Sequence, residues 1–236
     1  MADTVRTDGI YNLTEPVVMS FPALLEPKSF KENGKEKGEP KYSANFNFPA
    51  ASEDLKAMKA LAAKLARAKW PDKPFTRKYT DENGKEIVES VVVFPFTSGD
   101  KLADKRAGKG KDDGAFMRGK VVVAARSKYE PRLSYVDKGK IVDCEGDMAR
   151  QASKTKFYAG AEVLAQFNFV PYEAVGANGK PGVAVYLNMV MSTGKGARIA
   201  GGQTASEAFK GYVGSVSIED PTGPGSSADM DDHIPY

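Results

Sequence analysis

Hydrophobic and polar residues alternate over short stretches of this chain, and the alternation predicts β-strands along much of its length. Tyr42, Ala44, Phe46 and Phe48 recur at every second position, which places them on one face of a strand. The longest predicted hairpin is joined through an Asn-Gly dipeptide, which favours a tight turn. Short apolar runs bounded by turn residues predict further strands at residues 89–96, 120–126, 133–136, 157–172 and 182–191.

One segment has the three-and-four periodicity of a helix. Ser52 is a good N-cap, acidic residues fill the first turn where the helix dipole favours them, and Pro71 ends the segment. The spacing predicts a helix that packs on the sheet through a buried apolar stripe formed by Leu55, Met58, Leu61, Ala62 and Leu65.

The remaining segments are predicted to be irregular. Three prolines within residues 10–30 favour only a short strand near a sheet edge, and the charged, glycine-containing residues 31–40 and 97–118 predict long loops. Many short strands, one helix and long loops indicate a mainly β fold, an antiparallel barrel or sandwich, and not alternating βαβ units.

Charge is distributed unevenly along the 236 residues, which carry a net +3. Residues 217–236 contain five acidic residues and no Lys or Arg, so the rest of the chain carries +8. The run at 221–227 is rich in Pro, Gly and Ser and predicts a flexible tether. We therefore expect a folded domain at 1–216 and a flexible acidic tail at 217–236, a distribution typical of nucleic-acid-binding proteins whose tail competes for the binding groove.

Several classes of function are disfavoured by composition. The chain has one cysteine, Cys144, and one histidine, His233, which lies in the tail, so disulfides, Cys/His metal sites and nucleophile–base pairs are not expected. We expect no cofactor and no enzymatic activity. Neither a signal peptide nor an apolar run long enough to span a membrane is present, which favours a cytoplasmic protein without membrane partners.

The last eight residues combine acidic, apolar and aromatic side chains at a free carboxylate. This segment resembles the acidic tip of bacterial single-stranded DNA-binding proteins, with Met230 and His233 as departures. The resemblance implies that the tip recruits replication or recombination proteins, with a partner's apolar notch taking Ile234 and the Tyr236 ring. The residues that match by identity or aromatic character, and that we expect to bind a partner, are Asp229, Asp231, Asp232, Ile234, Pro235 and Tyr236.

A second resemblance covers roughly residues 10–205. The segments 157–163, 167–172 and 182–188, together with Gly201-Gly202 and Lys41-Tyr42-Ser43, are similar to a family of tailed-bacteriophage single-stranded DNA-binding proteins. The resemblance implies an OB-fold, which is an antiparallel Greek-key β-barrel, with one packed helix. It also implies single-stranded DNA binding during phage replication, recombination or repair in the cytoplasm of a bacterial host. The sequence does not determine the oligomeric state, and a homodimer is one of the alternatives.

A protein that binds single strands without sequence preference needs cations for the phosphates and aromatic rings for the bases. Residues 101–132 carry ten basic and four acidic side chains with interleaved aromatic rings, and similar pairings occur near residues 77–79 and 154–158. The residues predicted to contact DNA are Arg77, Tyr79, Lys105, Arg106, Lys109, Lys111, Phe116, Arg118, Lys120, Arg126, Tyr129, Arg132, Tyr135, Lys156 and Tyr158.

Three alternatives remain open at this point. A strand-annealing recombination protein would have similar charge and β content, and so would a virion structural protein. A magnesium-dependent nuclease would need clustered carboxylates, for which the candidates are Asp112, Asp113, Asp143, Glu145 and Asp147.

Overall fold

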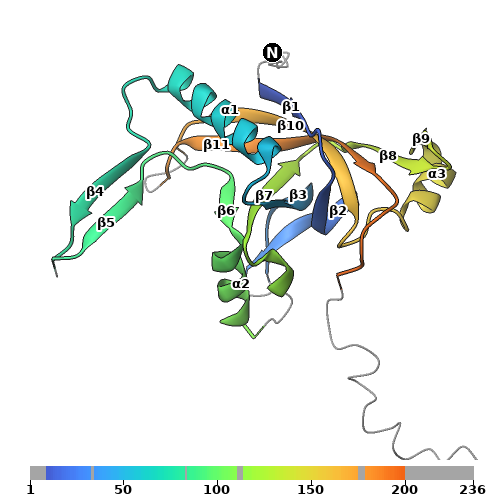
Figure 1. Cartoon of the computed structure of the whole chain (residues 1–236), viewed down its shortest axis with the longest axis horizontal. Coiled ribbons are helices and arrows are strands. Elements are labelled where there is room, and N and C mark those ends of the chain that lie inside the picture. Colours follow the sequence, from blue (N-terminus) through green and yellow to red (C-terminus); the bar gives the residue numbers. More distant parts are fainter. Residues whose placement is uncertain (1–8, 33–34, 83, 111–113, 175–178, 200–236) are drawn as a thin grey trace, which may run out of the picture. The chain divides into compact units, whose positions relative to one another are not determined.

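The chain is mainly β, as its alternating pattern predicts. The structure is a computed structural model, and residues 9–32, 35–82, 84–110, 114–174 and 179–199 are described (Figure 1). All of these residues belong to one compact unit.

Five sheet pairings link the six central strands in one continuous path. Strand β2 pairs with β3, β3 with β7, β8 with β11, β11 with β10, and β10 with β2. The two ends of this path, β7 and β8, are joined by a short bend of the chain, and β7 also lies close to β11. All pairs are antiparallel except β8 with β11, and this arrangement is the OB-like barrel that the resemblance implied. These six central strands are β2 (Val17–Glu32), β3 (Lys35–Pro49), β7 (Lys120–Ser127), β8 (Arg132–Asp137), β10 (Glu162–Tyr172) and β11 (Gly182–Ser192).

Shorter strands extend the barrel at its margins. Strand β1 pairs with β10, β6 with β7, and β9 with β8. Strands β4 and β5 form a separate two-stranded sheet (Figure 1). The bounds of these strands are β1 (Ile10–Asn12), β4 (Thr76–Thr80), β5 (Glu86–Ser90), β6 (Phe96–Ser98) and β9 (Lys140–Asp143).

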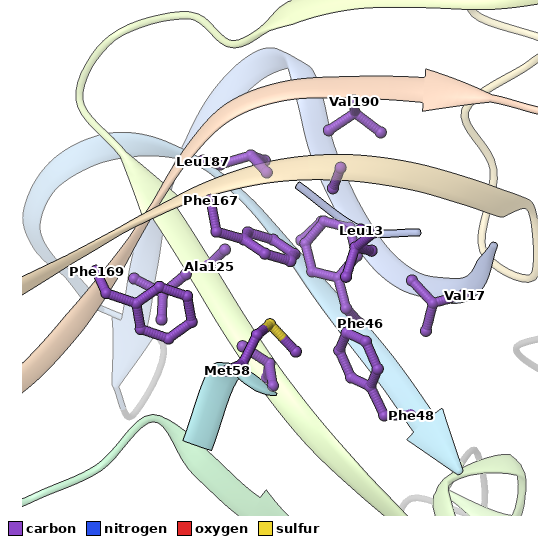
Figure 2. Close-up of a cluster of buried hydrophobic side chains, with 14 of the residues drawn as sticks. Leu13, Val17, Phe46, Phe48, Met58, Ala125, Phe167, Phe169, Leu187 and Val190 are labelled. Carbon is purple, nitrogen blue, oxygen red and sulfur yellow. The ribbon is translucent and has the colours of Figure 1, made fainter. Parts of the chain in front are cut away.

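Aromatic and aliphatic side chains from opposite strands fill the barrel (Figure 2). The Phe46 and Phe167 rings meet edge to face with centroids 4.8 Å apart, and Phe167 contacts Phe169 in a similar arrangement at 6.5 Å. Burial of one such ring stabilises the fold by about 2–3 kcal/mol. Of the predicted strand face, Ala44, Phe46 and Phe48 are buried, which confirms the alternation in β3.

Helix α1 (Glu53–Lys69) occupies the predicted position, and its Leu55, Met58 and Ala62 side chains are buried in the core. Figure 2 shows Met58 among the core side chains. The Ser52 side chain accepts a hydrogen bond from the Leu55 backbone N–H at 3.3 Å, as expected of an N-cap. The buried Asp54 carboxylate ties the helix to the loop between β1 and β2. It accepts hydrogen bonds from the Tyr11 hydroxyl and the Thr14 hydroxyl and backbone N–H.

This network shifts both ionisable groups. Burial alone would raise the pKa of Asp54, but the hydrogen bonds from Tyr11, Glu15 and Thr14 together outweigh it and lower the pKa below 3.8. Burial, followed by the hydrogen bond to Asp54, raises the pKa of Tyr11 to about 12. Both groups therefore keep their ordinary charge states at neutral pH.

Four sequence predictions about local structure are wrong. The predicted strand at 89–96 is absent over residues 91–95, where Val93 forms only an isolated bridge with Gly182. Residues 10–30 contain a long strand, because bulges after Ser20 and Ala23 accommodate Pro22 and Pro27 without ending β2. Most of the predicted loop at 31–40 belongs to β2 and β3, whose backbone pairing does not need an apolar pattern.

The predicted loop at 97–118 contains α2 (Gly99–Ala107) and the short 3₁₀ helix η2 (Ala115–Met117). A third helix, α3 (Gly146–Ser153), precedes β10. Helix α2 could not be predicted because it has few apolar residues and so shows no clear apolar stripe. In the structure it is closely packed, with Gly99 and Ala103 buried. A Cβ on Gly99 would lie 1.9 Å from the Met117 carbonyl oxygen.

Candidate nucleic-acid interface

The outer face of β3 and β7 presents polar and cationic side chains. In the register of these strands Ser43 lies opposite Arg126 and Asn45 opposite Ala124, while the intervening Ala44 and Ala125 are buried. The predicted contact Arg126 is therefore exposed on the barrel exterior. In OB-folds the face of the second and third strands is the usual surface for oligonucleotides.

An exposed ring stands beside this face on β2. Phe21 is 38% exposed and has a backbone φ of 50°, in the left-handed region that few residues other than glycine adopt. The β2–β3 register shifts between Ser20 and Ala23, and this bulge breaks the regular alternation at Phe21. A conformation that costs about 1–2 kcal/mol persists where neighbouring groups hold it, and such sites are often functional.

Two residues from the α2–η2 segment surround the Phe21 ring. The Arg106 guanidinium carbon lies 4.4 Å from the Phe21 ring centroid, and the Phe116 centroid lies 5.9 Å from it at a tilt of 50°. We call Phe21, Arg106 and Phe116 the ring cluster. The sequence predicted Arg106 and Phe116 but missed Phe21, for which the only signal was a Phe-Pro dipeptide within a strand.

The same segment supplies several cations near the ring cluster. Lys105 on α2 and Lys109 just after it are exposed, and Lys120 at the start of β7 is half-buried. The predicted contact Arg118 forms an ion pair with Asp104, with its Nη2 at 2.8 Å from the carboxylate. An exposed pair of this kind contributes about 0–1 kcal/mol, so a phosphate can compete for the guanidinium.

A second group of cations and rings lies near the start of β10. The Lys156 ammonium is 5.4 Å from the Tyr135 ring centroid, and the Arg198 guanidinium carbon is 4.3 Å from the Tyr158 centroid. The Tyr158 hydroxyl donates to the Gly196 carbonyl oxygen at 2.8 Å. Arg198 was not predicted, because it is far from Tyr158 in sequence.

Backbone hydrogen bonds connect this second group to β2. The Gly160 N–H donates to the Met19 carbonyl at 2.7 Å, and the Met19 N–H donates to the Ala161 carbonyl at 2.9 Å. The segment that carries Tyr158 is therefore attached to β2 shortly before Phe21. Each of the two groups is thus assembled from elements that are distant in sequence, and both adjoin β2.

The bend between β7 and β8 carries two more of the predicted contacts. Tyr129 is 81% exposed, and Arg132 is exposed at the start of β8. The neighbouring Lys128 forms an ion pair with Glu39 at 2.6 Å. Its hydrogen bond lowers the pKa of Glu39 and raises the pKa of Lys128, so both groups are charged at neutral pH.

Arg77 and Tyr79 lie apart from these groups, on β4. The Arg77 Nε is 2.6 Å from the Glu89 carboxylate of β5, and the Arg77 guanidinium carbon is 5.9 Å from the Tyr79 ring centroid. Residues 76–90 carry four acidic and three basic side chains, a net charge of −1. This hairpin is thus the least cationic of the predicted contact regions.

Some predictions fall outside the described residues. These are Lys111, the candidate carboxylates Asp112 and Asp113, the boundary after residue 216, and the tip residues Asp229, Asp231, Asp232, Ile234, Pro235 and Tyr236. Within the described residues, no group of three or more His, Cys, Asp or Glu side chains is placed to hold a metal ion. No helix of the described residues is long and apolar enough to cross a membrane.

The barrel is of the OB type, and its outer strands carry exposed aromatic rings beside cationic side chains. Both features are typical of OB-fold proteins that bind nucleic acids. The family comparison is more specific. Residues 12–220 match the family of the Enterobacter phage Enc34 single-stranded DNA-binding protein, and the chain belongs to this family. The family resemblance expected from the sequence is confirmed.

Solved structures agree with the assignment of the fold. The single-stranded DNA-binding protein of bacteriophage Enc34 in complex with single-stranded DNA has a TM-score of 0.57 at 15% identity, covering 84% of this chain and 97% of that chain. The same phage protein alone has a TM-score of 0.54 at 16% identity, covering 87% and 94%. No curated protein matches the chain.

Proposed function

We propose that this protein binds single-stranded DNA of its phage, without strong sequence preference, across the outer face of β2, β3 and β7. The ring cluster is the observation that carries this proposal. Its exposed Phe21 ring offers a stacking surface for a base, with a guanidinium 4.4 Å from the ring centroid and a second ring alongside. The solved complex of the Enc34 protein with single-stranded DNA supports the assignment.

The arrangement of cations supports a path for the phosphates. The strand passes Lys105, Lys109 and Lys120 near the ring cluster, crosses Arg126 on β7, and continues toward the group formed by Tyr158, Arg198, Lys156 and Tyr135. Tyr129 and Arg132 flank the path at the bend between β7 and β8. Arg118 joins it when a phosphate displaces Asp104. In this proposal Arg77 and Tyr79 stay outside the principal path, because their hairpin is net acidic.

The proposal predicts salt-dependent binding that favours unpaired strands. Because Trp70 is buried and its indole N–H lies 3.3 Å from the Glu173 carboxylate, a label on the DNA is a better reporter than tryptophan fluorescence. Fluorescence polarisation of labelled oligo-dT and of a matched duplex would be measured from low to moderate salt. We expect log affinity for oligo-dT to fall linearly with log salt, by roughly 0.7 per phosphate contact. Salt-independent or absent binding would refute the proposal and favour a virion structural role.

We propose that the protein binds DNA without catalysis. This part of the proposal rests on the family, whose model is that of a single-stranded DNA-binding protein. We infer that the protein protects or organises phage single strands in replication, recombination or repair within the bacterial cytoplasm. Labelled oligonucleotide incubated with Mg²⁺ should remain intact, and shortened product would revive the nuclease alternative. Annealing of complementary strands, followed by fluorescence quenching, separates the strand-annealing alternative from simple protection.

The acidic tail is proposed to recruit a replication or recombination protein. Asp229, Asp231 and Asp232 provide charge, while Ile234, Pro235 and Tyr236 provide an apolar and aromatic end. Capture of such an end needs an apolar notch beside an Arg or Lys of the partner. Adding one residue after Tyr236 should weaken capture of the host or phage replication partner in a surface-binding assay. Undiminished affinity of the extended chain would contradict end capture while leaving DNA binding untouched.

A further inference from the structure

The hairpin formed by β4 and β5 is an arm with little core of its own. Both of its faces are open to solvent, with Tyr79 46% exposed and Val88 58% exposed. An isolated two-stranded hairpin is marginally stable in water. Because Lys78 pairs with Val88 and Tyr79 with Ile87, each face of the arm carries one of the two exposed apolar side chains. Figure 1 shows β4 and β5 separated from the other strands of the described unit.

Ion pairs and backbone bonds hold the base of the arm in a defined place. The Glu89 carboxylate contacts both Arg77 of β4, at 2.6 Å, and Lys180, at 2.7 Å. The Lys180 ammonium also donates to the Ser90 carbonyl at 2.9 Å, and Val93 forms an isolated bridge with Gly182. The arm is therefore attached at the first residue of β11.

Strand β9 is attached at the other end of β11. Its partner β8 pairs with Met189–Ser192, the last residues of β11, and β9 is the terminal strand of the sheet path. At about 3.3 Å per residue, the two attachment points on β11 are roughly 25–30 Å apart. Within the described residues β9 pairs only with β8, and its Ile141 is 65% exposed.

The two ends carry complementary charge. The end of the arm, residues 80–86, contains Asp81, Glu82 and Glu86 against one lysine, a net −2. The turn between β8 and β9, residues 137–140, contains Lys138 and Lys140 against one aspartate, a net +1. Each end combines this charge with an exposed aliphatic side chain, Val88 on the arm and Ile141 on β9.

We propose that the β4–β5 arm of one copy docks along β9 of a second copy, so that neighbouring molecules on one DNA strand contact each other head to tail. This inference rests on the proposed function, because the DNA strand is what places copies side by side. The arm and β9 are attached at opposite ends of β11 and are different surfaces, so the contact between copies is heterologous. A heterologous contact repeats along a line when the rotation between copies does not close into a ring. The net −1 charge of the arm opposes phosphate, which favours a protein occupant over DNA.

The test separates DNA binding by one copy from contact between copies. Binding is measured to an oligo-dT of about ten nucleotides, which is within the site size of one OB-fold, and to one of about sixty nucleotides. The variants are Glu82→Lys, Lys138→Glu and the double variant, whose net charge equals that of the parent. Lys59→Glu on the exposed side of α1 is the control for a charge change elsewhere.

We expect all four variants to bind the short strand as the parent does. On the long strand the parent should bind cooperatively, each single arm or turn variant should lose about fivefold in cooperativity, and the double variant should recover most of it. A noncooperative parent, or single variants that match the control, would overturn the inference. If the parent protein does not bind the short strand, the proposed function itself is refuted.

Discussion

Replacement of Phe21 by glycine should separate DNA binding from folding more cleanly than any other single change. The ring is 38% exposed, and its backbone has a φ of 50°, which glycine adopts without strain. The substitution therefore removes a stacking surface while relieving about 1 kcal/mol of backbone strain. Loss of the contacts with Phe116 and Arg106 offsets that gain, so the free energy of unfolding should change by less than about 1 kcal/mol.

The expected loss of affinity follows from the stacking energy. One base stacked on an aromatic side chain contributes about 1–3 kcal/mol, which corresponds to a fall of roughly 5- to 150-fold in affinity. Arg106 and Phe116 cover part of the Phe21 ring, so a base can stack only on the part that stays exposed. We therefore expect a fall in affinity in the lower half of this range. The salt dependence should stay the same, because no phosphate contact is removed.

The assay is polarisation of labelled oligo-dT at fixed salt, with urea unfolding of each variant as the control for stability. Phe21→Leu retains apolar bulk and the strained backbone but removes the aromatic face, and it should lose affinity as the glycine variant does. Tyr79→Ala removes an exposed ring that also lies near an arginine, but on the acidic arm, and should leave affinity unchanged for an oligo-dT of about ten nucleotides, which holds a single copy. Unaltered binding by both Phe21 variants would refute the assignment of the ring cluster as a stacking site.

Three further predictions concern charge. The double variant Lys105→Ala/Lys109→Ala should reduce the slope of log affinity against log salt by about 1.4, and an unchanged slope would place these lysines off the path. Asp54→Asn should lower the free energy of unfolding by about 2 kcal/mol at pH 7, measured with urea. Folding lowers the pKa of Asp54 below its ordinary value of 3.8. The stabilisation by the Asp54 carboxylate is therefore fully present above pH 3.8 and should be lost as the pH falls through the lower pKa of the folded state. Deleting residues 226–236 should tighten DNA binding at low salt, and equal affinity there would exclude competition by the tail.

The barrel core could be predicted from the sequence because its signal is local. Alternation at Ala44, Phe46 and Phe48 identifies the buried face of β3 without knowledge of any partner strand, and the helix stripe at Leu55 and Met58 does the same for α1. Both patterns follow from the geometry of the element itself. The order of the strands was not predicted, since nothing local distinguishes the parallel pair of β8 and β11, and the family resemblance implied only the OB-fold.

The ring cluster could not be predicted as a unit. Phe21 occupies a bulge created by backbone register, and its neighbours come from a segment that the sequence presents as a glycine-rich loop. Proximity of cations and rings in sequence was also an incomplete guide. It named Arg106 and Phe116, which lie beside Phe21, and it gave equal weight to Arg77 and Tyr79, whose hairpin supplies a carboxylate to Arg77; the role of all four in DNA binding stays a prediction.

Charge segregation links the proposed surfaces to one another. The tail at 217–236 carries −5 and the arm at 76–90 carries −1, so removing both from the chain's +3 leaves +9 for the remainder. The tail and the arm, both proposed to contact proteins, are thus net acidic, and the remainder, which includes the part proposed to contact DNA, is net cationic. An acidic tail can occupy a free cationic surface and is released when DNA neutralises it. DNA binding by one copy would then make its tail available to a partner.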